Sequence, residues 1–156
     1  MNFDPSKPPD DIDWRILEIL QEDARSSFSE LGRRVAMSAP AVAERVRRLE
    51  DAGVITGYRA EVDLGRLGLP IAAVVRSRPG FDNKDRFEKA MRDAPGVLEC
   101  VRVTGDDCYV TKVVAPSMPE LQAVIDGLAG FGETTTSVVL SVPVRHRVVR
   151  RATPGG

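Results

Sequence analysis

The sequence of 156 residues is poor in the residue types that most often build metal and catalytic sites. It contains two cysteines, one histidine and one tryptophan, and 5% of its residues are aromatic. Cys100 and Cys108 are too few for the disulfide framework of a small secreted protein, so we expect both thiols to be reduced. His146 stands among arginines, at a spacing from the cysteines that fits no common metal site. We therefore expect no metal site, no catalytic residue and no bound cofactor.

Long apolar runs are also missing. No stretch approaches the roughly 20 apolar residues that a membrane-spanning helix needs. The first residues, MNFDPSKPPDD, are acidic and rich in proline, and they have neither the basic start nor the apolar stretch of a signal peptide. We expect a cytoplasmic protein without a membrane partner. With 42% hydrophobic and 29% charged residues, the composition is typical of a globular chain that forms one large or two small domains.

Neither sign of charge dominates the whole chain, because the formal net charge is −1. The charge is nevertheless distributed unevenly. Residues 1–23 carry −5 and residues 61–142 carry −3, whereas residues 24–60 carry +3 and residues 143–156 carry +4. Binding to nucleic acid depends on the local field at the contact surface, so the near-zero total does not exclude it.

Residues 27–53 predict a short helix, a tight turn and a second helix. Ser27 and Glu30 have the spacing of a capping box, which marks the start of the first helix. For the second helix, Ser38 is a good N-cap, Pro40 is tolerated in the first turn and Gly53 supplies the end. A preceding helix has its apolar residues at helical spacing, so we expect three helices at about 11–23, 27–36 and 39–52.

The second of these paired helices has an apolar inner face at positions 42, 46 and 49. On its outer face small residues come first and arginines follow. This order suits a helix whose N-terminus enters the major groove of DNA while its arginines contact phosphates or guanine edges. An ordinary solvated amphipathic helix is the alternative. The candidate DNA-binding residues are Ser38, Pro40, Ala41, Glu44, Arg45, Arg47 and Arg48.

The pattern changes after residue 69. Short strands are predicted at 71–76, 97–104, 108–115 and 134–145, and helices at 82–93 and, after a second capping box at Ser117 and Glu120, up to about residue 128. The order strand, helix, strand, strand, helix, strand is typical of a ferredoxin-like unit, with one antiparallel sheet and both helices on one face. The other face needs a cover, which predicts a homodimer.

The predicted organisation is therefore α+β. We expect a flexible arm at 1–9, a helix-turn-helix domain at 10–53, a strand and linker at 54–68, the ferredoxin-like domain at 69–149 and a tail at 150–156. The arginines of the tail can add phosphate contacts, although a solvated terminus is the commoner explanation.

The turn TGDDCY joins two predicted strands of the second domain and offers free backbone amides, a flexible glycine and two carboxylates. Such a turn can hold an amino group through a carboxylate and a carboxylate through amides. A plain acidic hairpin turn is the alternative, because glycine and aspartate are common in turns. The candidate effector-binding residues are Thr104, Gly105, Asp106, Asp107, Cys108 and Tyr109.

Residues 11–63, with the runs DIDWRILEILQEDAR, SELGRRVAMS and VAERVRRLEDAGVITGYRAEVD, resemble the leucine-responsive regulator/AsnC (Lrp/AsnC) family of transcription factors. The GVI-x-GY motif after the second paired helix is the most specific part of this likeness. The second half resembles the family through APGV, TGDDCY and TTSVVLS. Three positions depart from the family pattern: Phe28 and Glu44 in the first half, and Cys108 where an acid is usual.

The resemblance implies a three-helix, winged helix-turn-helix domain followed by a ferredoxin-like effector domain. It also implies a homodimer that assembles into larger even-numbered oligomers and binds amino acids between subunits. We expect a sequence-specific regulator of double-stranded DNA that responds to a small effector, an amino acid or a related metabolite. The alternative is an enzyme on the same scaffold, a sirohaem-type tetrapyrrole decarboxylase. Those enzymes use histidines, of which this chain has one.

Overall fold

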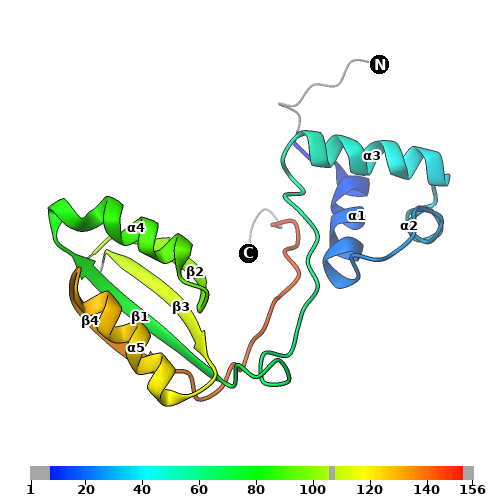
Figure 1. Cartoon of the computed structure of the whole chain (residues 1–156). Helices are drawn as coiled ribbons and strands as arrows, with labels where there is room; N and C mark the ends of the chain where they lie inside the picture. Colours follow the sequence, from blue (N-terminus) through cyan, green and yellow to red (C-terminus); the bar gives the residue numbers. More distant parts are fainter. Residues whose placement is uncertain (1–7, 106–107, 153–156) are drawn as a thin grey trace. The chain divides into compact units, whose positions relative to one another are not determined.

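The computed structural model describes residues 8–105 and 108–152, which form two compact units (Figure 1). Residues 8–60 and 144–152 belong to the first unit, and Glu61–Pro143 form the second. The first unit is thus built from two separate parts of the chain. Of the expected flexible arm, residues 1–7 lie outside the described residues. None of the described helices is long and apolar enough to span a bilayer.

The first unit contains the three predicted helices, α1 (Asp11–Glu22), α2 (Phe28–Val35) and α3 (Ala39–Asp51). Helix α1 begins with a complete capping box between Asp10 and Asp13. At α2 the Ser27 hydroxyl accepts a hydrogen bond from the Glu30 amide at 3.2 Å, but the Ser27 amide does not donate to the Glu30 carboxylate in return. At α3 the Ser38 hydroxyl accepts from the amide of residue 41 at 3.4 Å. The helix starts are therefore set by local side-chain caps.

The apolar stripes of the three helices meet in one core, as their periodicity predicts. Ile16 of α1, Leu31 of α2 and Val42 of α3 are fully buried. Ile19, Val35 and Val46 complete the cluster. Because α2 has only eight residues, packing against the two longer helices must supply its stability.

The turn between α2 and α3 is unusually close-packed. The Met37 amide donates a hydrogen bond to the Gly32 carbonyl at 2.9 Å, and Ala36 between them adopts the left-handed conformation with φ 56°. A Cβ at Gly32 would lie 2.5 Å from the Met37 carbonyl oxygen, closer than side chains tolerate. The angle between α2 and α3 therefore depends on the absence of a side chain at position 32.

The strand predicted after α3 is wrong. Residues 54–63 have no strand assignment, and residues 8–60 with 144–152 contain no wing hairpin. The amides of Val54 and Ile55 instead donate to the Leu49 carbonyl at the end of α3. The Tyr58 hydroxyl donates to the Glu50 carboxylate at 2.8 Å. β-branched residues favour an extended backbone, but a strand also needs a hydrogen-bonded neighbour.

The second unit has the predicted βαββαβ order and confirms the ferredoxin-like, α+β fold. One antiparallel sheet has the strand order β2-β3-β1-β4. A short 3₁₀ turn, η1 (Phe81–Asn83), precedes α4. The elements are β1 (Ile71–Pro79), α4 (Lys84–Asp93), β2 (Val97–Arg102), β3 (Tyr109–Ala115), α5 (Met118–Ala129) and β4 (Gly132–Val138).

Helices α4 and α5 cover one face of this sheet (Figure 1). Phe87 of α4 is fully buried, and the centroid of its ring lies 4.8 Å from the ring centroid of Tyr109 and 5.8 Å from that of Phe131. Leu121 and Leu128 of α5 pack against the same cluster. The opposite face keeps valine side chains partly or largely exposed, among them Val74, Val101 and Val110.

Three details of the second half differ from the predictions. The side chain of Ser117, which precedes α5, makes no capping hydrogen bond. Strand β4 ends at Val138 instead of residue 145; one further hydrogen bond joins the Val139 amide to the Ala72 carbonyl, and β1 itself begins at Ile71. Residues 144–149, expected in the ferredoxin-like domain, belong to the first unit.

Candidate DNA-binding and effector sites

The start of α3 presents the small, exposed surface that the sequence predicts. Ser38 and Pro40 are exposed and Ala41 is half-buried. One turn later Glu44 and Arg47 are both exposed. The first turn of α3 carries no acidic residue, so the partial positive charge of the helix N-terminus is not neutralised there. This surface is suited to the approach of an anionic partner.

Arg47 and Glu44 form an ion pair on the outer face of α3. The Arg47 Nη2 atom lies 3.0 Å from Glu44 Oε1 and 2.9 Å from Oε2, and the side chains are 67% and 55% exposed. The hydrogen bond that Arg47 donates to Glu44 raises the pKa of Arg47 above its usual value. An exposed pair of this kind contributes little to stability, so Arg47 can exchange the carboxylate for a phosphate at low cost.

Arg45, unlike Arg47, is largely buried, so its predicted position on the outer face of α3 is wrong. Its Nη1 atom lies 2.7 Å from Asp13 and 2.8 Å from Asp10, and only 19% of its side chain is exposed. Burial alone would lower the pKa of Arg45, but the hydrogen bonds to the two carboxylates outweigh it and raise the pKa. Arg45 therefore fastens α3 to the start of α1. Arg48 is half-buried, which leaves Arg47 the most exposed arginine of α3.

The pKa of Asp10 shifts in the opposite direction to that of Arg45. Burial favours its neutral form, but hydrogen bonds from the Asp13 amide and from Arg45 outweigh burial and lower the pKa of Asp10. Asp13 is 3% exposed, which makes it the most buried carboxylate among the described residues. The sequence prediction missed Asp13 and Gly32 as residues that position α3. The only local signal was the spacing of Asp10 and Asp13, which also fits an ordinary helix cap.

The predicted effector residues lie at the turn between β2 and β3. Thr104 and Gly105 are exposed, and Gly105 has φ 109°, a value that favours glycine. Cys108 is half-buried. Asp106 and Asp107 lie outside the described residues. Tyr109, only 2% exposed, points away from the turn, and its hydroxyl donates to Glu88 Oε1 of α4 at 2.7 Å.

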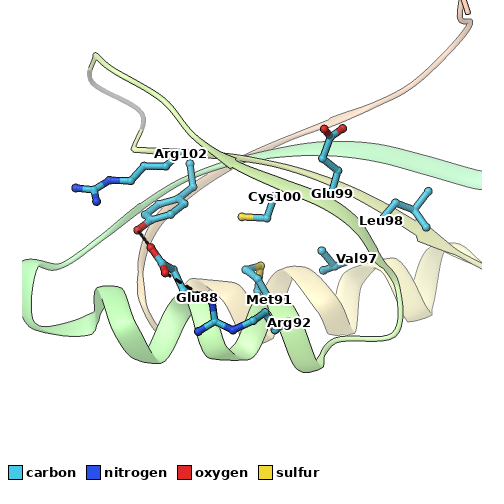
Figure 2. Close-up of a pocket in the computed structure, with 9 residues that line it drawn as sticks. Glu88, Met91, Arg92, Val97, Leu98, Glu99, Cys100 and Arg102 are labelled. Carbon is cyan, nitrogen blue, oxygen red and sulfur yellow. Dashed lines mark hydrogen bonds and ion pairs between the residues drawn. The ribbon is translucent and has the colours of Figure 1, made fainter. Parts of the chain in front are cut away.

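An open pocket of about 430 Å³ lies between α4 and β2 (Figure 2). Of the predicted effector residues that the structure describes, Tyr109 alone lines it. Burial and the hydrogen bond to Glu88 raise the pKa of Tyr109 to about 12, so its hydroxyl stays protonated at neutral pH. The lining residues are Glu88, Met91, Arg92, Val97, Leu98, Glu99, Cys100, Arg102 and Tyr109.

The pocket combines one charged side with one apolar side. Glu88 and Arg92 lie one helical turn apart on α4, and the Arg92 Nη1 atom lies 3.8 Å from Glu88 Oε2. Met91 and Cys100 turn their sulfur atoms towards the space between helix and strand (Figure 2). The Thr111 hydroxyl lies 3.3 Å from the Cys100 sulfur and 3.9 Å from the Met91 sulfur. A small molecule with a charged end and an apolar end fits this division.

Metal binding finds no support in the geometry. Within the part of the chain that the structure describes, no three histidine, cysteine, aspartate or glutamate side chains are grouped so that they could hold a metal ion. The ionisable residues of both sites instead form ion pairs and hydrogen bonds with one another. Their chemistry is that of anion and zwitterion binding.

Two family models match the chain, and the second extends from the second unit into residues 144–149 of the first. The AsnC-type helix-turn-helix domain matches residues 10–50, and the Lrp/AsnC ligand binding domain matches residues 73–149. The HTH-type transcriptional regulator LrpC of Bacillus subtilis is 37% identical over 132 residues, which cover 85% of this chain and 92% of LrpC. The leucine-responsive regulatory protein of Klebsiella pneumoniae is 35% identical over 143 residues, which cover 87% of each chain.

Solved structures agree with this assignment. The structure of Bacillus subtilis LrpC superposes with a TM-score of 0.85 and 35% identity, and the match covers 90% of this chain and 100% of LrpC. A transcriptional regulator of Neisseria meningitidis, solved as an L-Met complex, has a TM-score of 0.83 and 29% identity, with coverage of 90% and 95%. These relatives are regulators and lend no support to the decarboxylase alternative. The chain belongs to the Lrp/AsnC family and is a DNA-binding transcriptional regulator.

Proposed function

We propose that the protein binds double-stranded DNA as a homodimer, with α3 in the major groove, and that an amino acid effector changes its affinity or assembly. The observation that carries the DNA-binding part is the exposed start of α3 followed by exposed Arg47. We further propose that it acts in the cytoplasm, where the DNA lies, without a catalytic role or a bound cofactor. The regulators to which it is similar support this proposal.

The DNA contact is tested by replacing Arg47 with alanine and measuring affinity over a range of salt concentrations, on DNA fragments selected from the source genome. A lost phosphate contact should weaken binding and reduce the salt slope by about 0.9. Arg86→Ala, an exposed arginine of α4, is the control because it removes the same charge from the second unit. If the two variants bind alike, Arg47 does not contact DNA.

For the effector we propose a free amino acid with an apolar side chain, bound where the α4–β2 pocket meets the turn after β2. Its carboxylate would pair with Arg92, its ammonium group with Glu88, and its side chain would lie against Met91 and Cys100. The L-Met complex of the related Neisseria meningitidis regulator supports an amino acid as the ligand class.

Two variants test the position of this site. Cys100→Phe fills the pocket and Gly105→Trp blocks the turn, so each should abolish the shift in melting temperature that the matching amino acid produces in the parent protein. Phe81→Trp, at an exposed position before α4, is a control that should respond like the parent. A normal response in Cys100→Phe would exclude the pocket, and one in Gly105→Trp would exclude the turn.

The homodimer is proposed to form through the uncovered face of the sheet. Val101 of β2 lies directly opposite Val110 of β3, and Val74 of β1 lies on the same face, opposite Lys112. Val101 is 41% exposed, which is costly for a valine on a flat surface unless a partner covers it. Larger even-numbered oligomers would then form through contacts near the turn after β2. Light scattering on Gly105→Trp should therefore show a shift towards dimers.

A further inference from the structure

The C-terminal segment, residues 144–152, is attached to α1 by specific contacts. The Val149 amide donates to Gln21 Oε1 at 2.8 Å, and Gln21 Nε2 donates back to the Val149 carbonyl at 3.0 Å. The Arg151 guanidinium forms an ion pair with Asp11. The side-chain amide of Gln21 thus bonds both polar groups of one residue that lies 128 positions further along the chain.

These contacts give the segment a direction. Gln21 lies in the last turn of α1, and Asp11 is the first residue of that helix. The ten positions between them span roughly 15 Å along the helix axis. Residues 149–151, with the long side chain of Arg151, therefore lead from the end of α1 towards its beginning, where Arg45 of α3 meets Asp10 and Asp13.

The charge of the first unit depends on this segment. Residues 1–60 contain nine basic and eleven acidic side chains, which give a net charge of −2. Residues 144–156 contain four arginines and no acidic residue, and they bring the unit to +2. Five of the acidic side chains belong to α1 itself or to its N-cap. Without the segment, a helix-turn-helix unit of negative net charge would have to approach a polyanion.

All four arginines of the segment are exposed; Arg151 pairs with Asp11, and the other three are Arg145, Arg147 and Arg150. A merely solvated terminus would not explain why both polar groups of Val149 are bonded to a side chain of α1. We propose that residues 144–152 form a second DNA-contacting element, in which Gln21 and Asp11 hold the backbone and Arg145, Arg147 and Arg150 contact phosphates. The partner is the DNA backbone, so this contact adds affinity without sequence preference.

The test replaces all three arginines with glutamine and measures DNA binding at several salt concentrations. Each lost phosphate contact should reduce the salt slope by about 0.9, and affinity should fall roughly tenfold or more near 0.1 M salt. The matched control is the triple variant Arg66→Gln, Arg86→Gln and Lys89→Gln, which removes three exposed charges from the second unit. If both triple variants show the same slope and affinity, the segment does not contact DNA.

A neutral variant tests whether docking is required. Gln21→Leu keeps the size and charge of the unit but loses both bonds to Val149, so it should weaken DNA binding at least threefold while the melting temperature stays within about 2 °C. Unchanged affinity in this variant would overturn the holding role of Gln21. The inference rests on DNA binding by α3, and Arg47→Ala keeps the two questions separate. If Arg47→Ala weakens DNA binding and the triple variant of Arg145, Arg147 and Arg150 does not, α3 contacts DNA and residues 144–152 do not.

Discussion

Arg45 and Arg47 stand two positions apart on α3, yet their surroundings assign them opposite roles. Two positions correspond to a rotation of about 200° around a helix, so the side chains leave on different faces. Arg45 turns towards α1 and meets Asp13, which is 3% exposed, whereas Arg47 remains in solvent beside Glu44. Charge of the same sign therefore serves folding at one position and stays exposed to solvent at the other.

Arg45→Met is expected to destabilise the first unit by about 3 kcal/mol, because Asp13 keeps a buried charge that has lost its cation. This value is at the lower end for broken buried pairs, since 19% of the Arg45 side chain remains exposed. Denaturant unfolding of the variant measures the change. Full stability combined with weak DNA binding would instead restore Arg45 as a direct DNA contact.

Tyr109 gives the second unit a pH dependence in the alkaline range. Its pKa is raised from 10.0 to about 12, so the folded state holds the proton more tightly than the unfolded state. The stabilisation is complete below about pH 10 and is lost as the pH rises towards 12. A shift of this size corresponds to roughly 2 to 3 kcal/mol.

Tyr109→Phe should therefore flatten the fall in unfolding free energy between pH 10 and pH 12, as measured by urea unfolding at each pH. Tyr58→Phe is a useful comparison, because Tyr58 donates to Glu50 in the first unit and is 47% exposed. An equally steep fall in Tyr109→Phe would assign the alkaline transition to another group.

At the scale of elements, the turn between α2 and α3 depends on position 32. Gly32→Ala should destabilise the protein by about 1 to 3 kcal/mol and weaken DNA binding, because the new methyl group must push the Met37 carbonyl away. Gly127→Ala in α5 is the matched control, with no atom within 4 Å of the added Cβ. It should stabilise by about 0.5 to 1 kcal/mol. Thermal unfolding of both variants measures the two changes in stability, which should have opposite signs. Unchanged stability in Gly32→Ala would show that the turn is free to adjust.

The helices of both units could be predicted because their signals are local. Ser27 and Ser38 cap the helices that follow them, and the apolar residues recur at helical spacing. The strand predicted for 54–63 and the extension of β4 to residue 145 failed for one common reason. A strand forms only where another strand supplies its hydrogen bonds, and the sequence of the segment does not contain that information.

The candidate sites could be predicted only in part, because their decisive contacts are distant in sequence. Arg45 and Asp13 are 32 positions apart, and the helical phase of α3 alone placed Arg45 on the outer face together with Arg47. The pocket joins α4, β2 and β3, of which the sequence prediction named only the turn before β3. Arg47 and the start of α3 were placed correctly on the outer face, because helical periodicity decides that face.

At the scale of the whole molecule, Val101→Asp is expected to convert the proposed dimer into monomers. An aspartate at this position of the proposed interface loses its hydration beside Val110, at a cost of several kcal/mol. The dissociation constant should rise at least about 100-fold. Phe81→Asp, at a position that is 83% exposed before α4, is the control and should leave the mass unchanged. Multi-angle light scattering measures both, and a Val101→Asp protein of unchanged mass would place the interface elsewhere.

The position of residues 144–152 on the first unit also has a consequence for biosynthesis. A ribosome completes α1, α2 and α3 early, then makes Glu61–Pro143, and only afterwards releases the segment that bonds to Gln21 and Asp11. During that interval the three helices can pack, but the unit keeps its negative net charge. Nascent chains should therefore bind DNA more weakly than the finished protein, because the affinity that the C-terminal arginines add is gained only when their translation is finished.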